Sequence, residues 1–164
     1  MARQRRTERD WKRRSLGQNF LVDQHLAHRL VTDLGLVPGD LVVEIGAGTG
    51  ALTVPLAATG ADVLAIEIDH RWAEQLRDRI GRIESQRRVR IIETDLRRLR
   101  LPKRPYRVVA NTPFGSTTEL LSRLLDDPGR GPTRADLIVQ REVAIKHTTV
   151  PPVALRTAAW NPWW

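Results

Sequence analysis

The stretch Leu41-Val42-Val43-Glu44-Ile45-Gly46-Ala47-Gly48-Thr49-Gly50 decides the fold. It begins as a short apolar run that is rich in β-branched residues, a composition typical of a strand buried on both faces. It ends in three closely spaced glycines. Because glycine lets the backbone turn tightly and approach another group closely, this segment predicts a strand that leads into a sharp loop.

The rest of the chain alternates between strand and helix patterns on either side of this stretch. Strands are predicted at residues 62–68, 89–93, 106–111 and 135–140, and helices at 24–34, 49–59, 70–84, 117–125 and from 141 onward. Asp23 and Asp69 precede two of these helices and are predicted to be their N-caps. Such alternation predicts an α/β fold with a mostly parallel sheet and helices on both faces, which binds ligands at the carboxyl ends of its strands.

The glycine loop narrows the class of ligand. Its spacing is G-x-G-x-G, and Glu44 stands two positions before the first glycine. This differs from the dinucleotide pattern G-x-G-x-x-G and is the usual form in enzymes that use S-adenosylmethionine. A plain tight turn, or a nucleotide-binding loop of another class, is the alternative.

Acidic residues stand at the ends of the next two predicted strands. Glu67 lies at the end of the second strand and is placed to accept the ribose hydroxyls of a bound nucleoside, with Asp69 as the rival for that role. Asp95 follows the third strand, where a carboxylate can accept a hydrogen bond from the amine of an adenine ring. The alternative for Asp95 is a loop carboxylate that balances the surrounding arginines.

The fourth predicted strand ends in Asn111-Thr112-Pro113-Phe114, a form of the (D/N)-P-P-(Y/F) motif of enzymes that methylate exocyclic amines of bases. Such an amine is a poor nucleophile until acceptors orient its N–H groups, and Asn111 Oδ1 and the Thr112 carbonyl are candidates for those acceptors. Pro113 stiffens the loop, and Phe114 offers a ring on which an extruded base can stack. A strand-terminating turn with a core Phe is the alternative.

Composition and charge limit the classes of possible partner. The 164 residues suffice for one domain, and the absence of cysteine excludes disulfides and Cys-ligated zinc or iron–sulfur sites. The net charge of +8 is concentrated, with seven Lys/Arg in residues 1–14 and nine in residues 87–107. This clustering favours nucleic acid as the partner and an anionic membrane second, whereas a solvated Arg-rich face is the alternative. No long apolar run follows the basic N-terminus, so no signal peptide is expected, and no apolar stretch approaches transmembrane length. The absence of cysteine fits a cytoplasmic protein.

Taken together, these motifs resemble the ribosomal RNA adenine N6-methyltransferases, a family that includes the erythromycin-resistance methylases and the small-subunit dimethyladenosine transferases. The resemblance runs from about Arg13 to the end of the chain. It is carried by Gln18-Asn19-Phe20-Leu21, the segment from Glu44 to Gly50, Glu67, Asp95 and Asn111-Thr112-Pro113-Phe114. The basic arm, the Asn-x-Pro-Phe form and Gln140-Arg141-Glu142-Val143-Ala144 are more similar to the erythromycin-resistance branch.

The resemblance implies a division of the chain and a set of site residues. Residues 1–14 would be a flexible basic arm, and residues 15–164 a Rossmann-like catalytic domain in which the last strands of the usual sheet and the C-terminal RNA-binding domain are missing. The implied cofactor contacts are Gln18, Asn19, Leu21, Gly46, Gly48, Glu67, Asp95 and Asn111. The catalytic residues would be Asn111, Thr112, Pro113 and Phe114, and RNA would contact Arg5, Arg6, Arg9, Lys12, Arg13 and Arg14.

The implied activity is S-adenosylmethionine-dependent N6-methylation of an adenine at the macrolide site in the peptidyl-transferase loop of 23S rRNA, which would confer macrolide-type antibiotic resistance. The substrate would be naked RNA or a pre-ribosomal particle, and the enzyme a cytoplasmic monomer with no metal and no membrane partner. One alternative is methylation of small-subunit rRNA or of DNA adenine. The other is a non-catalytic RNA-binding or ribosome-assembly factor that has kept the cofactor fold.

Overall fold

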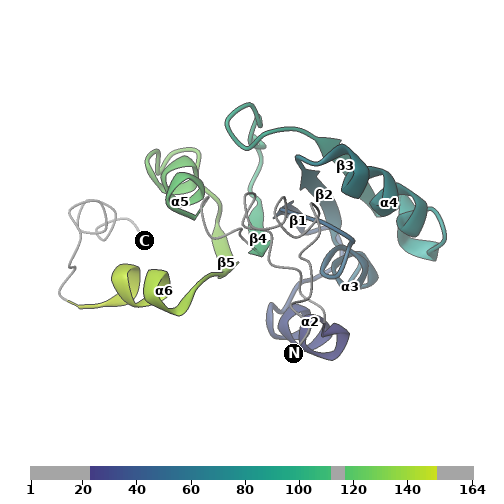
Figure 1. Ribbon diagram of the computed structural model, residues 1–164, viewed down its shortest axis with the longest axis horizontal. Helices are drawn as coiled ribbons and strands as arrows, with labels where there is room; N and C mark the ends of the chain where they lie inside the picture. The colour runs from purple at the N-terminus through teal and green to yellow at the C-terminus, as the bar shows by residue number, and fades with distance from the viewer. Residues whose placement is uncertain (1–22, 112–116, 151–164) are drawn as a thin grey trace, which may run out of the picture.

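The computed structural model describes residues 23–111 and 117–150 (Figure 1). The five strands described there form one sheet in the order β3-β2-β1-β4-β5, and every neighbouring pair is parallel. The strands are β1 (Leu41–Ile45), β2 (Asp62–Glu67), β3 (Val89–Glu93), β4 (Arg107–Asn111) and β5 (Arg134–Ile138). The predicted α/β fold with a parallel sheet is confirmed. The strand order reverses between β1 and β4, which is where open sheets of this kind bind ligands.

One helix precedes β1, and further helices follow β1, β2, β4 and β5 along the chain. They are α2 (Gln24–Asp33), α3 (Thr53–Ala58), α4 (His70–Ile80), α5 (Thr117–Leu125) and α6 (Arg141–Thr148), with a short 3₁₀ helix η1 (Glu84–Arg88) before β3. The side chain of Asp23 accepts from the backbone N–H groups of His25 and Leu26, and thereby caps α2 as predicted. No helix of the described ranges is long and apolar enough to cross a membrane.

Two apolar clusters cover the two faces of the sheet, because successive strand residues point to opposite sides. One cluster joins Val42, Val63 and Val109 to buried residues of α2, α3 and α4, including Leu56 and Leu76. The other joins the alternate strand residues, such as Val43 and Val108, to Leu120 and Leu124 of α5. The prediction of helices on both faces is therefore confirmed. Beyond β5, α6 has no buried residue and extends away from the sheet (Figure 1).

Several element bounds differ from the sequence-based predictions. The helix predicted over 49–59 begins only at Thr53, because Gly50 has a φ of 84°, which a right-handed helix excludes. Pro55 lies in the first turn of α3, where its missing N–H costs no intrahelical hydrogen bond. The helix predicted over 70–84 ends at Ile80, and η1 follows it as an element that the pattern did not predict.

Candidate functional site

The glycine loop lies against the end of β2. The amides of Gly46 and Ala47 donate to the carbonyl of Ile66 at 2.9 and 3.0 Å, so the chain turns sharply as it leaves β1. Gly46 and Gly48 have φ values of 76° and 53°, a region that L side chains rarely adopt. The loop conformation therefore depends on glycine at these two predicted cofactor-binding positions.

Gly46 also lies close to the end of β4. A Cβ atom added at Gly46 would stand 3.3 Å from the backbone oxygen of Asn111. Since β1 and β4 are neighbours in the sheet, the first glycine of the loop and the first residue of the predicted catalytic tetrapeptide meet at one edge. The structure thus brings together two motifs that stand 65 positions apart in the sequence.

The carboxylate of Glu67 organises the loop. Its Oε2 accepts the N–H of Gly48 at 2.8 Å, and its Oε1 accepts the N–H groups of Ile68 and Asp69, both at 2.9 Å. The residue is 5% exposed. A carboxylate has about four acceptor positions, so the hydrogen bonds within the described residues leave about one on Glu67 for a ligand.

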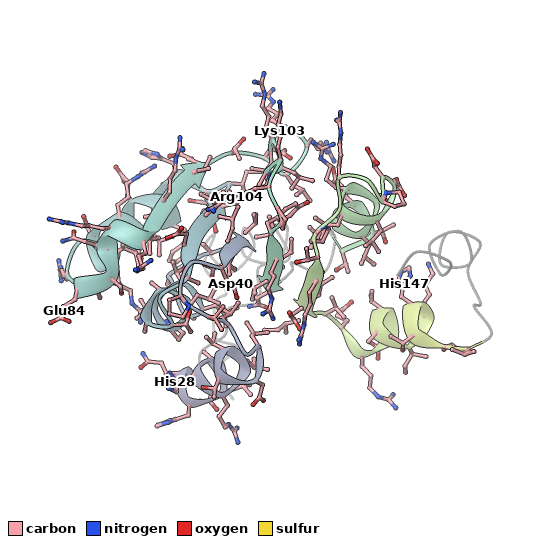
Figure 2. The ribbon with its side chains drawn as sticks, turned by 180° about the vertical axis from the view of Figure 1, so that it is seen from behind. His28, Asp40, Glu84, Lys103, Arg104 and His147 are labelled. Atoms are coloured by element: carbon pink, nitrogen blue, oxygen red, sulfur yellow. The ribbon has the colours of Figure 1, made fainter. Side chains whose placement is uncertain are left out.

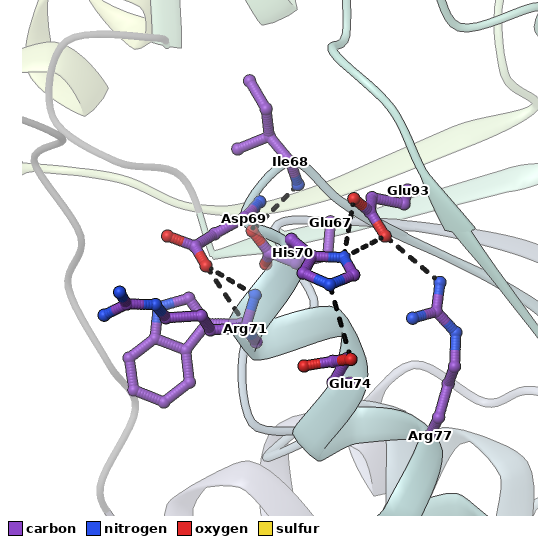
Figure 3. Close-up of polar contacts among 9 residues, drawn as sticks. Glu67, Ile68, Asp69, His70, Arg71, Glu74, Arg77 and Glu93 are labelled. Atoms are coloured by element: carbon purple, nitrogen blue, oxygen red, sulfur yellow. Dashed lines mark hydrogen bonds and ion pairs between the residues drawn. The ribbon is translucent and has the colours of Figure 1, made fainter.

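The choice between Glu67 and Asp69 rests on what each side chain contacts. Asp69 Oδ1 accepts the N–H groups of Arg71 and Trp72 at 2.9 and 3.4 Å, so Asp69 is the N-cap of α4, as predicted. Between the two acids, the side chain of Ile68 is 59% exposed (Figure 3). Ile68 is not among the residues expected from the sequence to form the site, because the exposure of one aliphatic side chain at a strand end is not visible in a local pattern.

Asp95 is positioned by a bond between strand ends. The N–H of Thr94 donates to the carbonyl of Glu67 at 3.0 Å, which holds the start of the loop after β3 beside the end of β2. The side chain of Asp95 accepts the N–H of Arg97 at 2.8 Å, and its carbonyl accepts the N–H groups of Arg98 and Leu99. Asp95 therefore begins a helical turn at the same edge as Glu67. It makes no ion pair among the described residues, but its charge helps Glu119 to raise the pKa of Arg97, so the alternative role as a counter-charge stays open.

Glu44 is the second acid that the structure buries at this edge. It is 1% exposed in the middle strand, and its Oε2 has no hydrogen-bond partner among the described residues. Burial raises the pKa of Glu44 to about 8; the nearby Glu67 carboxylate adds to this rise, and the polar groups of Thr53 oppose it. Since an unpaired buried charge is costly, Glu44 is held largely in its neutral form below that pH.

A cluster of charged side chains flanks the site on the β3 side (Figure 3). His70 Nδ1 contacts both carboxylate oxygens of Glu93 at 3.1 Å, and its Nε2 lies 3.4 Å from Glu74. Arg77 also pairs with Glu93, at 3.3 Å. The hydrogen bond between His70 and Glu93 raises the pKa of His70 and lowers that of Glu93. The cluster is largely exposed and joins the first turns of α4 to the end of β3.

Many predicted site residues lie outside the described ranges. These are the cofactor contacts Gln18, Asn19 and Leu21, the catalytic residues Thr112, Pro113 and Phe114, and the whole basic arm with Arg5, Arg6, Arg9, Lys12, Arg13 and Arg14. The structure describes the remaining ones, Gly46, Gly48, Glu67, Asp95 and Asn111, and gathers them at the carboxyl ends of the strands.

One arginine of the second basic segment, residues 87–107, makes contacts within the protein that occupy its charged group. The Arg107 side chain is 15% exposed, its Nη2 donates to the carbonyl of Leu34 at 2.7 Å, and its guanidinium lies 3.6 Å from Asp136 and 3.9 Å from Asp40. Arg107 therefore ties the end of α2 to the sheet and cannot also serve a polyanion.

A cavity of about 260 Å³ lies between α2, β4 and β5. Its lining is mostly apolar, with Leu30, Leu52 and Ile138 among its residues, and Asp33, Arg134 and Asp136 provide the charged part. None of the described site residues lines it. Within the described residues, no group of three or more His, Cys, Asp or Glu side chains is placed to hold a metal ion.

Comparison with known proteins gives a consistent set of relatives. An rRNA methyltransferase of Streptomyces thermotolerans is 38% identical over 143 residues, which is 87% of this chain and 46% of that protein. An rRNA adenine N-6-methyltransferase of Corynebacterium diphtheriae is 36% identical over 147 residues, or 90% of this chain and 55% of that protein. Ribosomal RNA small subunit methyltransferase A of Leifsonia xyli is 40% identical over 114 residues, or 68% and 41%. The chain spans about half the length of the curated relatives it matches.

Solved structures support the same assignment. The 23S rRNA methyltransferase ErmE superposes with a TM-score of 0.69 at 30% identity, which covers 79% of this chain and 51% of that one. A dimethyladenosine transferase from Plasmodium falciparum superposes with a TM-score of 0.68 at 25% identity, covering 80% and 46%. Residues 9–157 match the ribosomal RNA adenine dimethylase family over nearly the whole chain. The chain, with its glycine loop, buried Glu67 and strand-end Asn111 on one edge of a parallel sheet, therefore belongs to the ribosomal RNA adenine dimethylase family.

Proposed function

We propose that this chain carries the catalytic domain of an S-adenosylmethionine-dependent methyltransferase that modifies N6 of an adenine in 23S rRNA. The observation that carries the proposal is the meeting of Gly46, Gly48, Glu67 and Asn111 at the switch point of the sheet. The activity is that of the family to which the chain belongs, and the proposed target is that of the relative ErmE, named a 23S rRNA methyltransferase.

The described residues fit a nucleoside-containing cofactor. Gly46 and Gly48 keep side chains out of the loop, and Glu67 retains about one acceptor position, which suits one ribose hydroxyl. Acceptance of both hydroxyls by Glu67 requires that its bond to Gly48 be given up or shared. The exposed side chain of Ile68 offers an apolar surface to an adenine ring, and Asp95 stands at the adjacent strand end for the ring amine.

The chemistry follows from orientation more than from acid–base catalysis. S-adenosylmethionine, when bound, supplies an activated methyl group. Asn111 and the Thr112 carbonyl hold the N–H groups of the target amine so that its lone pair points at that methyl carbon, and Phe114 stacks on the extruded base. After transfer, the methylated amine loses a proton to water. No metal is part of this proposal.

Residues 1–14 are proposed as an RNA-binding arm, and residues 15–164 as the catalytic domain. Because the seven cations of the arm would release counterions from RNA, removing the arm should weaken binding and reduce its dependence on salt. We further propose that the protein is a monomer that acts in the cytoplasm on 23S rRNA, either naked or in a pre-ribosomal particle, and that the modification confers macrolide-type resistance.

The deciding experiment is transfer of labelled methyl from S-adenosylmethionine to purified large-subunit rRNA, small-subunit rRNA and DNA, with primer extension to locate the product. Label on an adenine of the peptidyl-transferase loop is the expected result. Label on small-subunit rRNA would establish the second candidate, which the 40% identity to a small-subunit methyltransferase favours. Absence of label on all three, with cofactor binding retained, would refute the catalytic proposal and favour a non-catalytic RNA-binding or assembly factor.

A further inference from the structure

The second basic segment folds back on itself, so its cations form groups that the sequence does not reveal. Arg87 and Arg88 precede β3, and Lys103 and Arg104 precede β4, which places all four at the amino-terminal edge of the parallel sheet. Asp62, at the start of β2, pairs with Arg88 at 3.4 Å and with Arg104 at 3.6 Å. Arg104 lies against the strands in Figure 2, whereas Lys103 points outward.

Further cations continue from this edge toward the candidate site. Arg90 is exposed on β3, the edge strand, and Arg98 is exposed in the turn that begins at Asp95, beside the end of that strand. β3 has five residues and therefore spans about 17 Å. We use the name basic belt for the six exposed side chains Arg87, Arg88, Arg90, Arg98, Lys103 and Arg104.

The belt carries an excess of charge that the protein itself does not neutralise. Within the described residues, Asp62 is the one carboxylate that pairs with the belt, and it is shared by Arg88 and Arg104. Two other arginines of the same region differ: Arg97 pairs with Glu119, and Arg107 is largely buried beside Asp136. Six cations against one shared carboxylate form a surface that attracts a polyanion.

The residue types of the belt favour the phosphate backbone of a nucleic acid over unpaired bases or a membrane surface. Five of its six cations are arginines, whose planar guanidinium groups match phosphate oxygens in a bidentate manner. The aromatic residues of the described ranges are Trp72 and Tyr106, and neither is exposed, so the belt has no described ring on which unpaired bases could stack. The exposed large apolar side chains of those ranges all lie outside the segment 87–104 that carries the belt, which disfavours insertion into a membrane.

We infer that the basic belt is a second RNA-binding surface, which holds the phosphate backbone of a double-stranded segment that flanks the target adenine. The inference rests on the proposed function and extends it from the reacting base to the neighbouring stem. Shape and backbone contacts dominate the recognition of duplex RNA, and a belt of about 17 Å along a strand faces several successive phosphates. The stem would run along the β3 edge while the target base reaches the carboxyl ends of the strands.

The test compares two triple variants of the full chain with equal loss of charge. The belt variant is Arg87→Gln/Arg90→Gln/Lys103→Gln, whose side chains are exposed and have no ion pair among the described residues, so the fold should persist. The control variant is Arg29→Gln/Arg141→Gln/Lys146→Gln, on α2 and α6. The probes are a fluorescein-labelled RNA hairpin with a stem of about 16 base pairs, the span of a double-stranded RNA-binding domain, and an unstructured RNA of equal length.

The belt variant should bind the hairpin with a Kd raised about tenfold or more, and its slope of log affinity against log salt should be smaller by about 2–3. The control variant should match the unmodified protein, and binding of the unstructured RNA should change little in either variant. Equal binding by the two variants, or an equal loss on both RNAs, would overturn the inference. Methyl transfer by the unmodified chain is measured in a separate assay. If the proposed function is wrong, that assay shows no labelled RNA, and this result does not depend on whether the belt binds the hairpin.

Discussion

The change Glu67→Gln tests how the candidate site is built. Glu67 Oε2 accepts the N–H of Gly48 at 2.8 Å, while Oε1 accepts two further amides at 2.9 Å. In the variant, the side-chain oxygen can keep the two Oε1 bonds, but an NH₂ group replaces Oε2 and faces the N–H of Gly48. Two donors then oppose each other at a residue that is 5% exposed, where water replaces the lost bond poorly.

The magnitude follows from the loss of one hydrogen bond to a charged group, which is worth about 1.5–3 kcal/mol. A loss of about 2 kcal/mol should lower the Tm by about 4–8 °C in a chain of this size. If the same contact orders the loop for S-adenosylmethionine, an equal loss in binding free energy raises its Kd about 30-fold. Differential scanning calorimetry and isothermal titration with S-adenosylmethionine measure the two quantities.

Glu93→Gln is the matched control, because Glu93 occupies the paired register position on β3. Its partners His70 and Arg77 are largely exposed, and contacts of this kind contribute about 0–1 kcal/mol, so its Tm should fall little and its cofactor Kd should not change. The reasoning is refuted if Glu67→Gln melts and binds as the unmodified protein does, or if Glu93→Gln loses as much cofactor affinity.

Three further changes probe the loop, the buried acid and the chemistry. Gly50→Ala should lower the free energy of unfolding by about 2–5 kcal/mol in urea titrations, because it combines backbone strain at a φ of 84° with a Cβ atom 2.6 Å from Leu76 Cδ1. The control is Gly39→Ala, which has a φ of 91° and open space around the new Cβ, so it should lose only the contribution of backbone strain. Equal losses in the two variants would contradict the packing argument. The pKa of Glu44 is raised from 4.5 to about 8 in the folded protein, so its neutral form stabilises the fold fully below pH 4.5 and this contribution is lost as pH rises to about 8. The Tm of Glu44→Gln should therefore not show that decline with pH. Parallel curves of Tm against pH for the variant and the unmodified protein would refute this prediction. Asn111→Ala should lower kcat by about 100-fold or more while the cofactor Kd changes little, and equal losses in methyl-transfer and titration assays would indicate a purely cofactor-binding role.

Local sequence patterns predicted the elements well where one residue type dictates the conformation. The apolar run 41–45, the caps Asp23 and Asp69, and the parallel alternation of strands and helices are all confirmed. Helix bounds were less accurate. The predicted start of α3 at Thr49 is wrong because the turn continues through Gly50, whose positive φ belongs to the loop, and the apolar pattern past Ile80 did not reveal the separate 3₁₀ helix.

The residues of the candidate site were likewise predicted from the sequence, whereas their surroundings were not. The sequence alone identified Glu67, Asp95 and Asn111 as strand-end residues, because strand ends and polar residue types are local properties. The sequence did not reveal the exposure of Ile68, nor that three backbone amides already occupy most of the Glu67 carboxylate. Exposure and hydrogen-bond partners depend on which segments meet in space.

Sequence by itself determined the alternation of elements, the glycines at the end of β1 and the excess of positive charge, since each is a property of residue type and spacing. Only the tertiary structure decided the environment of each charge. It buries Glu44 in the central strand, packs Arg107 beside Asp136, and leaves Lys103 exposed with no ion pair among the described residues. The physical reason is that burial and charge pairing depend on strand order and on contacts between segments far apart in the chain, which local periodicity does not encode.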